Sequence, residues 1–261
     1  MHVFDLFSLK GKVALITGGY GLYGSQLTEA LAEAGATVIT ASRSLDKNEA
    51  YAAELRAKGY EVYGEAFDQA DEASILALRD RLIARFGKVD ILVNNSVLRC
   101  CKDFNGPAEN FARSMEVNAT GLFLISRAFG NHMAERKEGS IINIGSYMGS
   151  LGINDTLYED VPHISSRCAA DYYFHKGGMH NLTRFLAGYY GPDGVRCNCL
   201  ALGGLFNHQP EPFLEQYKKA TFLGRMAECD DIKGMIVYLA SDASRYTTGT
   251  VIPIDGGYSA K

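Results

Sequence analysis

Residues 12–24, KVALITGGYGLYG, decide the fold of this chain of 261 residues. Residues 12–17 are almost all apolar or β-branched, which predicts a strand that is buried on both faces. Glycines at positions 18, 21 and 24 follow at once, and a helical pattern then covers residues 26–34. A buried strand that leads through a glycine turn into a helix predicts the first βαβ unit of a parallel sheet.

The alternation of strand and helix continues to the end of the chain. Apolar runs predict further strands at 37–42, 60–67, 89–95, 140–146, 195–202 and 250–255, and helical patterns cover 46–58, 72–86, 109–136, 171–190 and 229–241. This pattern predicts one domain over residues 1–261, an α/β fold with a Rossmann-type, doubly wound parallel sheet of seven strands and helices on both faces. The lack of an eighth strand–helix unit argues against a closed barrel.

Two long segments, residues 147–170 and 204–224, interrupt this alternation. Both follow the carboxyl end of a predicted strand, where open α/β sheets bind their ligands. Loops of this length in a compact domain usually serve function. We therefore expect an inserted substrate loop at 147–170 and a substrate-lid segment at 204–224.

The overall composition excludes several classes of partner. The net charge is −4 and the charges are scattered, so no basic stripe is available for a nucleic acid. No apolar run approaches the roughly 20 residues of a membrane-spanning helix, and the N-terminus lacks a signal-peptide pattern. We expect a cytoplasmic protein that binds a small molecule, with neither nucleic acid nor membrane as a partner.

The glycine turn predicts a dinucleotide cofactor. Glycine lets the backbone approach a pyrophosphate, and the following helix supplies unpaired N–H groups at its N-terminus. An NAD-specific enzyme would place a carboxylate at the end of the second strand. This chain has Ser42 and Arg43 there, and a guanidinium beside a hydroxyl suits a 2′-phosphate. The sequence therefore favours NADP(H), with NAD(H) as the alternative.

A tyrosine and a lysine mark the candidate reaction centre. Tyr172 and Lys176 are four residues apart at the start of a predicted helix, so both side chains lie on one helical face. Ser146 ends the fifth predicted strand, and Asn118 lies in the sequence EVNATG within the long helix.

Taken together, these motifs resemble the short-chain dehydrogenase/reductase family over nearly the whole chain. The motifs occur in the family's order, namely the glycine turn, Asp68, NNSV at 94–97, Asn118, Ser146, Tyr172, Lys176 and the C-terminal stretch from LGRMAECDDI to IDGGYSA. Each motif is weak alone, whereas the ordered set is specific.

The resemblance implies a role for each catalytic residue. Tyr172 would act as the acid/base, because reduction of a carbonyl needs a proton at oxygen as hydride reaches carbon. Lys176 nearby would favour the phenolate and would also bind the nicotinamide ribose. Ser146 would hydrogen-bond the substrate oxygen. Asn118 would hold a water that links Lys176 to solvent.

The same resemblance implies a wider set of cofactor contacts. Asp68 and Gln69 would meet the adenine, and Asn95 the adenosine ribose region. Gly203 and Leu205 would approach the nicotinamide carboxamide through their backbone. The complete set expected at the cofactor is Gly18, Tyr20, Gly21, Leu22, Tyr23, Gly24, Ser42, Arg43, Asp68, Gln69, Asn95, Ser96, Tyr172, Lys176, Gly203 and Leu205.

The chain departs from the family pattern in four places. NNSV at 94–97 lacks the family's glycine, so a differently shaped loop is expected there. Leu22 occupies the position of the family's second glycine, a spacing more like that of extended, nucleotide-sugar-modifying relatives. The sequence Leu202-Gly203-Gly204 replaces the usual Pro-Gly, which would loosen that loop. The segment between Ser146 and Tyr172 is clearly longer than the family usually has.

This longer loop predicts a hydroxylated substrate, because burying an apolar substrate against its polar side chains would leave polar atoms without partners. Tyr147, Tyr158, Glu159 and His163 are its candidate substrate contacts. The loop resembles an insertion in relatives that modify bacterial sugars, and the opening DLFSLKGKVALITG is similar to that of gluconate and keto-sugar-acid dehydrogenases. A surface lid or a subunit contact is the alternative. Its acidic residues and His163 match no standard metal spacing, so no metal is expected.

The expected function is an NADP(H)-dependent transfer of hydride between nicotinamide and the carbonyl or alcohol carbon of a sugar, sugar acid or related polyol. The alternatives are a 3-oxoacyl thioester reductase, a non-catalytic nicotinamide-binding regulator and a nucleotide-sugar epimerase. The acidic loop argues against the thioester reductase. The intact tyrosine and lysine argue against the non-catalytic regulator, and the short C-terminal region argues against the epimerase. The resemblance also implies a homodimer or homotetramer, paired through the long helix at 109–136 and the helix after Tyr172.

Overall fold

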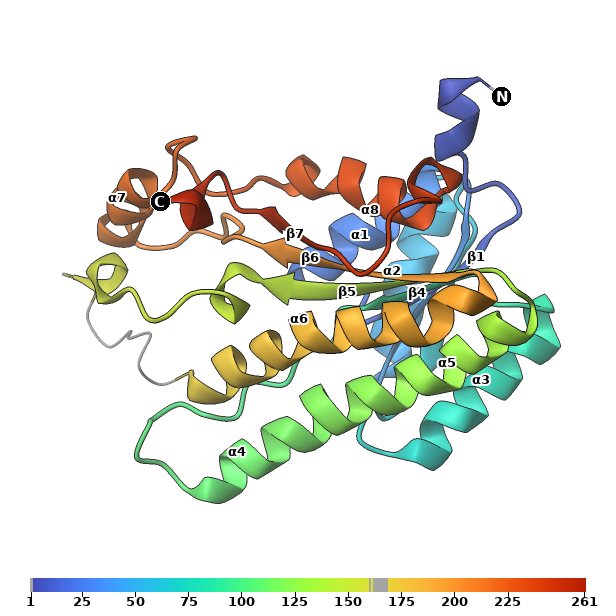
Figure 1. Ribbon diagram of the computed structural model, residues 1–261, viewed down its shortest axis with the longest axis horizontal. Coiled ribbons are helices and arrows are strands. Elements are labelled where there is room, and N and C mark those ends of the chain that lie inside the picture. The colour runs from blue at the N-terminus through green and yellow to red at the C-terminus, as the bar shows by residue number, and fades with distance from the viewer. Residues whose placement is uncertain (1, 160, 162–168) are drawn as a thin grey trace.

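The computed structural model describes residues 2–159, 161 and 169–261, and it contains the predicted doubly wound sheet (Figure 1). Within these residues, seven parallel strands lie in the order β3-β2-β1-β4-β5-β6-β7. The strands are β1 (Val13–Thr17), β2 (Thr37–Ser42), β3 (Val62–Ala66), β4 (Ile91–Asn94), β5 (Gly139–Ser146), β6 (Val195–Leu202) and β7 (Val251–Ile254). The order reverses between β1 and β4, and such sheets bind ligands at this switch point.

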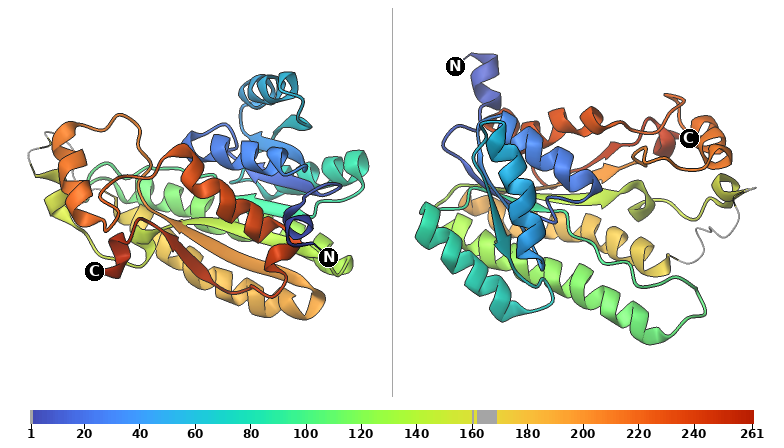
Figure 2. Two further views of the ribbon diagram at one scale, coloured as in Figure 1. Left: turned by 90° about the horizontal axis from the view of Figure 1, so that it is seen from above. Right: turned by 180° about the vertical axis from the view of Figure 1, so that it is seen from behind.

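Helices cover both faces of the sheet, as predicted (Figures 1 and 2). One face is covered by α1 (Leu22–Glu33), α2 (Leu45–Ala57) and α8 (Lys233–Ala240), and the other by α3 (Glu72–Phe86), α5 (Leu122–Glu135) and α6 (Ala170–Tyr190). Successive strand residues point to opposite faces, so Ala14 and Ile16 pack in the first layer and Val13 and Leu15 in the second. Burial on both sides explains why the strands are almost continuously apolar.

The long helix predicted at 109–136 is not one regular α-helix. It consists of α4 (Ala108–Met115), a π-helical segment (Glu116–Gly121) and α5. A Cβ atom at Gly121 would lie 2.2 Å from the carbonyl oxygen of Gln69, so the π-helical segment packs directly against the loop after β3. Helical periodicity does not reveal this turn, because a π segment interrupts the pattern only locally and its packing partner is distant in sequence.

Several other elements differ in extent from the predictions. Helix α1 begins at Leu22, directly after the glycine turn, and the helix expected at 229–241 begins as a 3-10 turn (Cys229–Ile232). The predicted lid segment contains α7 (Glu211–Ala220), and the described part of the inserted loop contains 3-10 turns at Tyr147–Gly149 and Asp155–Tyr158. Because α7 packs against the second of these turns, the two insertions meet beyond the carboxyl ends of β5 and β6 (Figure 1).

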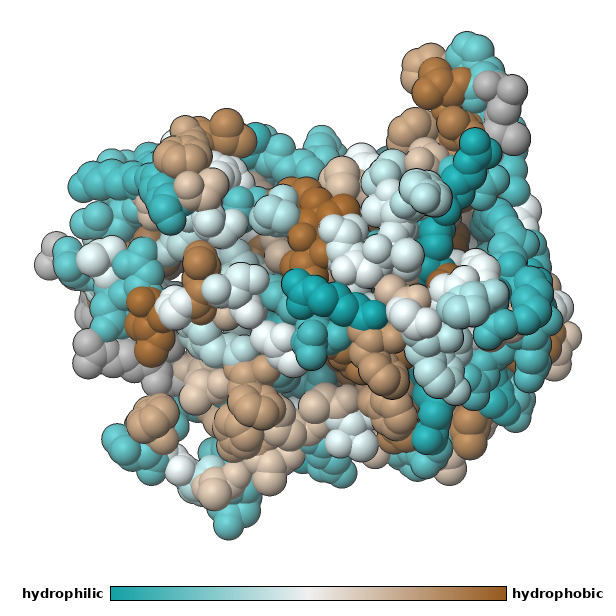
Figure 3. Space-filling model, in the orientation of Figure 1, coloured by the Kyte–Doolittle hydropathy of each residue, from teal (hydrophilic) through white to brown (hydrophobic). Residues whose placement is uncertain are grey.

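Two of the places where the surface carries apolar side chains concern the helices α5 and α6 and the N-terminus. The space-filling view shows hydrophobic residues over α5 and α6 (Figure 3), where Phe123, Phe174 and Phe185 are exposed. The N-terminal 3-10 helix (Val3–Phe7) projects from the end of the molecule opposite to α7, with Phe4 exposed (Figure 2). Among the described helices, none is long and apolar enough to cross a membrane.

Candidate active site

A cavity of about 1420 Å³ lies at the carboxyl ends of the strands. Its wall includes every residue of the predicted cofactor set, from Gly18 and Tyr20 in the glycine turn to Gly203 and Leu205 after β6. Ser146, at the end of β5, lines it as well. The topology explains this convergence, because parallel strands end at the same edge of the sheet.

The glycine turn is held in place by Asn95, which follows β4. The Asn95 Nδ2 donates to the carbonyl oxygens of Thr17 and Gly18, each at 3.0 Å. A Cβ atom at Gly24 would lie 2.1 Å from the Gly18 carbonyl oxygen, so α1 can approach the turn only with glycine at this position. At Gly21 the same contact would be 3.2 Å, a much milder constraint. The cradle that results brings the start of α1 to the cavity and fits a pyrophosphate.

The cavity wall at the end of β2 is basic. Arg43 and Lys47 line it together with the hydroxyls of Ser42 and Ser44. The Asn48 Nδ2 donates to the Ser42 hydroxyl at 2.9 Å and so fixes its position. Two cations beside two hydroxyls fit a phosphate group on the adenosine ribose.

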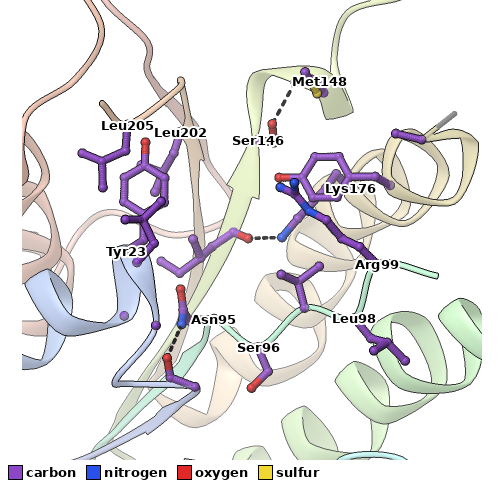
Figure 4. A pocket seen from close by; sticks show the side chains of 18 of the residues that line it. Tyr23, Asn95, Ser96, Leu98, Arg99, Ser146, Met148, Lys176, Leu202 and Leu205 are labelled. Carbon is purple, nitrogen blue, oxygen red and sulfur yellow. Dashed lines mark hydrogen bonds between the residues drawn. The ribbon is translucent and has the colours of Figure 1, made fainter. Parts of the chain in front are cut away.

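The candidate reaction centre consists of Ser146, Tyr172 and Lys176, which all line the cavity. Figure 4 shows Ser146 and Lys176 on the same side of it. Lys176 is 3% exposed, and its Nζ donates to the carbonyl oxygen of Ile144 at 2.5 Å. The Nζ lies 5.6 Å from the centre of the Tyr172 ring. Burial lowers the pKa of the Lys176 amine. The Ser146 Oγ accepts a hydrogen bond from the Met148 backbone at 3.2 Å, and its own proton remains available to a ligand.

Asn118 lies in the π-helical segment and does not line the cavity. Its Oδ1 accepts from the Leu98 backbone N–H at 2.9 Å, and its Nδ2 donates to the Leu98 carbonyl at 2.6 Å and to the Ser114 hydroxyl at 2.9 Å. The side chain therefore positions the segment after β4. Its part in a water relay to Lys176 stays a prediction.

The glycine pair after β6 is firmly held, and the expected loosening of this loop was wrong. The Gly203 N–H donates to the Ile254 carbonyl at 2.8 Å, and the Tyr23 hydroxyl donates to the Gly203 carbonyl at 2.6 Å. The Gly204 N–H donates to the Tyr217 hydroxyl at 2.6 Å. Tyr23 belongs to the first turn of α1 and Tyr217 to α7, so hydroxyls from two different helices constrain the loop in the absence of proline.

Aromatic side chains form the wall beyond Tyr172. Tyr147 and Tyr158 line it as predicted, together with Tyr173, Phe213 and Tyr217. The ring centres of Tyr158 and Phe213 are 5.5 Å apart, and those of Phe213 and Tyr217 are 5.8 Å apart. Burial raises the pKa of Tyr147, so its hydroxyl stays protonated and is able to donate a hydrogen bond.

Two predicted substrate contacts are not part of this wall. Glu159 does not line the cavity, and His163 lies outside the described residues. Within the described ranges, no group of three His, Cys, Asp or Glu side chains is placed to hold a metal ion.

Comparison with known proteins decides the family. A family model described as enoyl-(acyl carrier protein) reductase matches residues 23–259. The chain belongs to the short-chain dehydrogenase/reductase family. It is therefore an oxidoreductase, and NAD or NADP is the cofactor that this family binds.

The relatives of this short-chain dehydrogenase act on different alcohols. It is 32% identical to the D-threitol dehydrogenase of Mycolicibacterium smegmatis, over 99% of this chain and 96% of the relative. It is 31% identical to the (2S)-[(R)-hydroxy(phenyl)methyl]succinyl-CoA dehydrogenase subunit BbsD of Thauera aromatica, over 96% and 98%. The crystal structure of a gluconate 5-dehydrogenase from Burkholderia cenocepacia J2315 in complex with NADP and tartrate matches with a TM-score of 0.90 and 30% identity, over 100% of both chains.

The polar residues of this dehydrogenase's cavity wall that the sequence did not identify include Arg99, Lys102 and Asp171. Asp171 directly precedes Tyr172, and its position in the motif was the available signal. Arg99 and Lys102 lie in the irregular segment between β4 and α4, where no periodicity operates. Their one signal was that they follow the carboxyl end of a strand at the switch point.

Proposed function

We propose that the protein is an NADP(H)-dependent oxidoreductase that interconverts an alcohol and a carbonyl on a sugar, sugar acid or related polyol. The observation that carries this proposal is the convergence of Ser146, Tyr172 and Lys176 on the cavity into which the glycine turn also opens. The bound nicotinamide would supply or accept the hydride.

Each reacting group has a defined task in this proposal. The Ser146 hydroxyl donates to the substrate oxygen and stabilises the negative charge that develops there. Tyr172 delivers a proton to that oxygen in reduction and removes it in oxidation. Lys176 holds a buried amine near the phenol, tied to the Ile144 carbonyl, and its charge would favour the phenolate.

The choice of NADP rests on the wall at the end of β2. Arg43 and Lys47 would pair with a 2′-phosphate, and the Ser42 hydroxyl would hydrogen-bond to it. The related gluconate 5-dehydrogenase was solved with NADP. An NAD-specific site would instead present a carboxylate to the ribose hydroxyls.

A polyhydroxylated substrate suits the far end of the cavity. Tyr147, Tyr158 and Tyr173 offer both flat apolar rings and hydroxyls, which match the C–H faces and hydroxyls of a sugar. Two of the relatives described above act on a tetritol and on gluconate. A hydroxyacyl thioester is the second candidate, because one relative acts on a CoA thioester and because Arg99 and Lys102 add positive charge to the wall.

A substrate panel tests the proposal. Purified protein is incubated with NADP or NAD and with alditols, aldonic acids and 3-hydroxybutyryl-CoA, and the absorbance of the reduced nicotinamide is followed. We expect turnover with NADP and at least one alditol or aldonic acid. Turnover of the thioester alone would support the second candidate. Binding of NADP without turnover of any compound in the panel would contradict the proposed substrate class.

The assembly state is also a proposal. Phe123, Phe174 and Phe185 are exposed on α5 and α6 (Figure 3), the helices through which the family resemblance implies pairing. We expect a homodimer or homotetramer, and sedimentation equilibrium at micromolar concentration would test it. A monomer would contradict this expectation.

A further inference from the structure

The segment between β4 and α4 places a guanidinium beside the proposed acid/base. The Cζ of Arg99 lies 4.7 Å from the centre of the Tyr172 ring, within the range of a cation–π contact. Figure 4 shows Arg99 and Lys176 reaching the same part of the cavity from different elements. Because Arg99 is an exposed residue on an irregular segment, contact with the ring orients a side chain that would otherwise sample many rotamers.

The charges of this wall do not cancel. Arg99 and Lys102 both line the cavity, and among the described residues neither forms an ion pair with a carboxylate. Arg113 also lines it but is paired with Glu116. Asp68 and Asp171 are the carboxylate residues among the described residues that line the cavity, so its cations outnumber its anions.

Asp171, beside Tyr172, contributes little to this wall. Its side chain is 2% exposed, and its Oδ2 is buried and has no hydrogen-bond partner among the described residues. A ligand in the cavity therefore meets the cations of the wall and not this carboxylate oxygen.

We propose that this wall is a subsite for the acid group of a polyhydroxy acid, in which Arg99 and Lys102 bind the substrate carboxylate. The inference rests on the proposed function and selects the acids from among the sugars, sugar acids and polyols. Arg99 is then a specificity residue. Its planar fork matches a carboxylate, and its contact with Tyr172 sets the distance from the carboxylate to the carbon that reacts.

Binding of three ligands that share the same four-carbon chain and differ in the number of carboxylates tests the subsite. Threitol, threonate and tartrate of one threo configuration carry none, one and two carboxylates. Their affinities are measured by calorimetry on protein saturated with NADP, at fixed ionic strength. We expect threonate and tartrate to bind at least about tenfold more tightly than threitol, the effect of a hydrogen-bonded charge. Equal affinity for threitol and threonate would overturn the proposal.

Variants assign the effect to Arg99. Arg99→Ala should reduce the preference for threonate over threitol to below about threefold, and Arg99→Lys should retain part of it. Arg245→Ala, which removes an exposed arginine of the 3-10 turn after α8, is the matched control and should leave the preference unchanged. If Arg99→Ala weakens both ligands by the same factor, Arg99 serves Tyr172 and not a carboxylate, and the proposal fails.

Kinetics separate this inference from the proposed function. D-gluconate and D-glucitol share their configuration and differ in the carboxylate, as do D-galactonate and galactitol. We expect kcat/KM to favour the acid in each pair that reacts, and Arg99→Ala to raise KM for the acid more than it lowers kcat. Turnover of the alditols alone would overturn the inference and leave the proposed function standing. Absence of turnover with every member would overturn both.

Discussion

The Nζ of Lys176 donates a hydrogen bond to the carbonyl oxygen of Ile144, 2.5 Å away across the packing of α6 on β5. This bond fixes a buried amine 5.6 Å from the centre of the Tyr172 ring. Neither residue forms the site alone. The helix supplies the tyrosine and the lysine, and the strand decides where the amine is held.

Replacement of Tyr172 by Phe removes the proposed acid/base and little else. We expect kcat to fall by about 10²- to 10⁴-fold, the usual contribution of a general acid/base. The dissociation constant of NADPH should change little, because the ring remains. Steady-state kinetics and fluorescence titration of NADPH check the two expectations. Tyr246→Phe, at a fully exposed tyrosine, is the control, and equal losses in the two variants would contradict the role of Tyr172.

The burial of Lys176 has a consequence for stability. Burial lowers its pKa below the ordinary value of 10.5. At pH values between the lowered pKa of Lys176 in the folded protein and its ordinary pKa in the unfolded chain, the unfolded chain holds a proton that the folded protein lacks. In this pH range Lys176 therefore makes the stability of the wild type rise with pH. Lys176→Met abolishes this dependence. The unfolding free energy of the variant minus that of the wild type should therefore be largest at the low end of this pH range. The difference should shrink as the pH approaches 10.5.

Urea unfolding at a series of pH values, without cofactor, measures this difference. Loss of the hydrogen bond to Ile144 shifts the difference by the same amount at every pH and leaves its slope intact. Lys219→Met, at an exposed lysine, should show no such slope. A difference between Lys176→Met and wild type that does not vary with pH would show that the amine titrates normally.

The basic wall after β2 predicts the cofactor preference. Arg43→Ala should raise KM for NADPH by about 10- to 100-fold, the cost of losing a charge-assisted hydrogen bond, and should leave KM for NADH nearly unchanged. Both coenzymes are compared in wild type and variant with the same substrate. Preference for NADH in the wild type would overturn the assignment of Arg43.

The geometry of the glycine turn predicts that alanine at Gly24 lowers stability more than alanine at Gly21. At Gly24 a methyl group would meet the Gly18 carbonyl oxygen at 2.1 Å, and at Gly21 the distance would be 3.2 Å. Gly24→Ala should therefore lower stability by about 1–3 kcal/mol and impair NADPH binding, whereas Gly21→Ala should have a much smaller effect. Thermal unfolding with and without NADPH measures both. Similar losses in the two variants would mean that the turn relaxes easily.

The hydroxyl of Tyr217 predicts a link between α7 and the loop after β6. Tyr217→Phe leaves the partly buried Gly204 N–H without its acceptor, which should cost about 1 kcal/mol. KM for NADPH should rise as well, because this loop lines the cavity. Tyr246→Phe, at a fully exposed tyrosine, is the control for urea unfolding. A variant as stable as the control would show that the loop finds another partner.

Much of the molecule follows from local sequence. Residues 12–24 specify a buried strand, a glycine turn and a helix, because burial on both faces demands apolar residues and because Gly24 admits no side chain. The order of strands and the position of the cavity then follow from the handed, parallel topology of such sheets. For this reason the cofactor set predicted from the sequence lines one cavity without exception.

Only the tertiary structure decided the remaining features. The π turn at Asn118 arises where Gly121 meets Gln69, a contact between segments that no local pattern connects. Gly203 and Gly204 look loose in the sequence and are held by Tyr217 in the following helix α7 and by Tyr23, which is 180 residues away along the chain.

The difference between local and tertiary contacts also explains which polar residues of the cavity wall could be predicted from the sequence. Tyr172 and Lys176 are recognisable because four residues of helix place them on one face, a local rule. Arg99 reaches Tyr172 from an irregular segment, where no periodic rule relates sequence to position. Local order thus determined the sheet and the cofactor cradle, whereas the contacts that shape the substrate end depend on packing between distant segments, which sequence spacing does not encode.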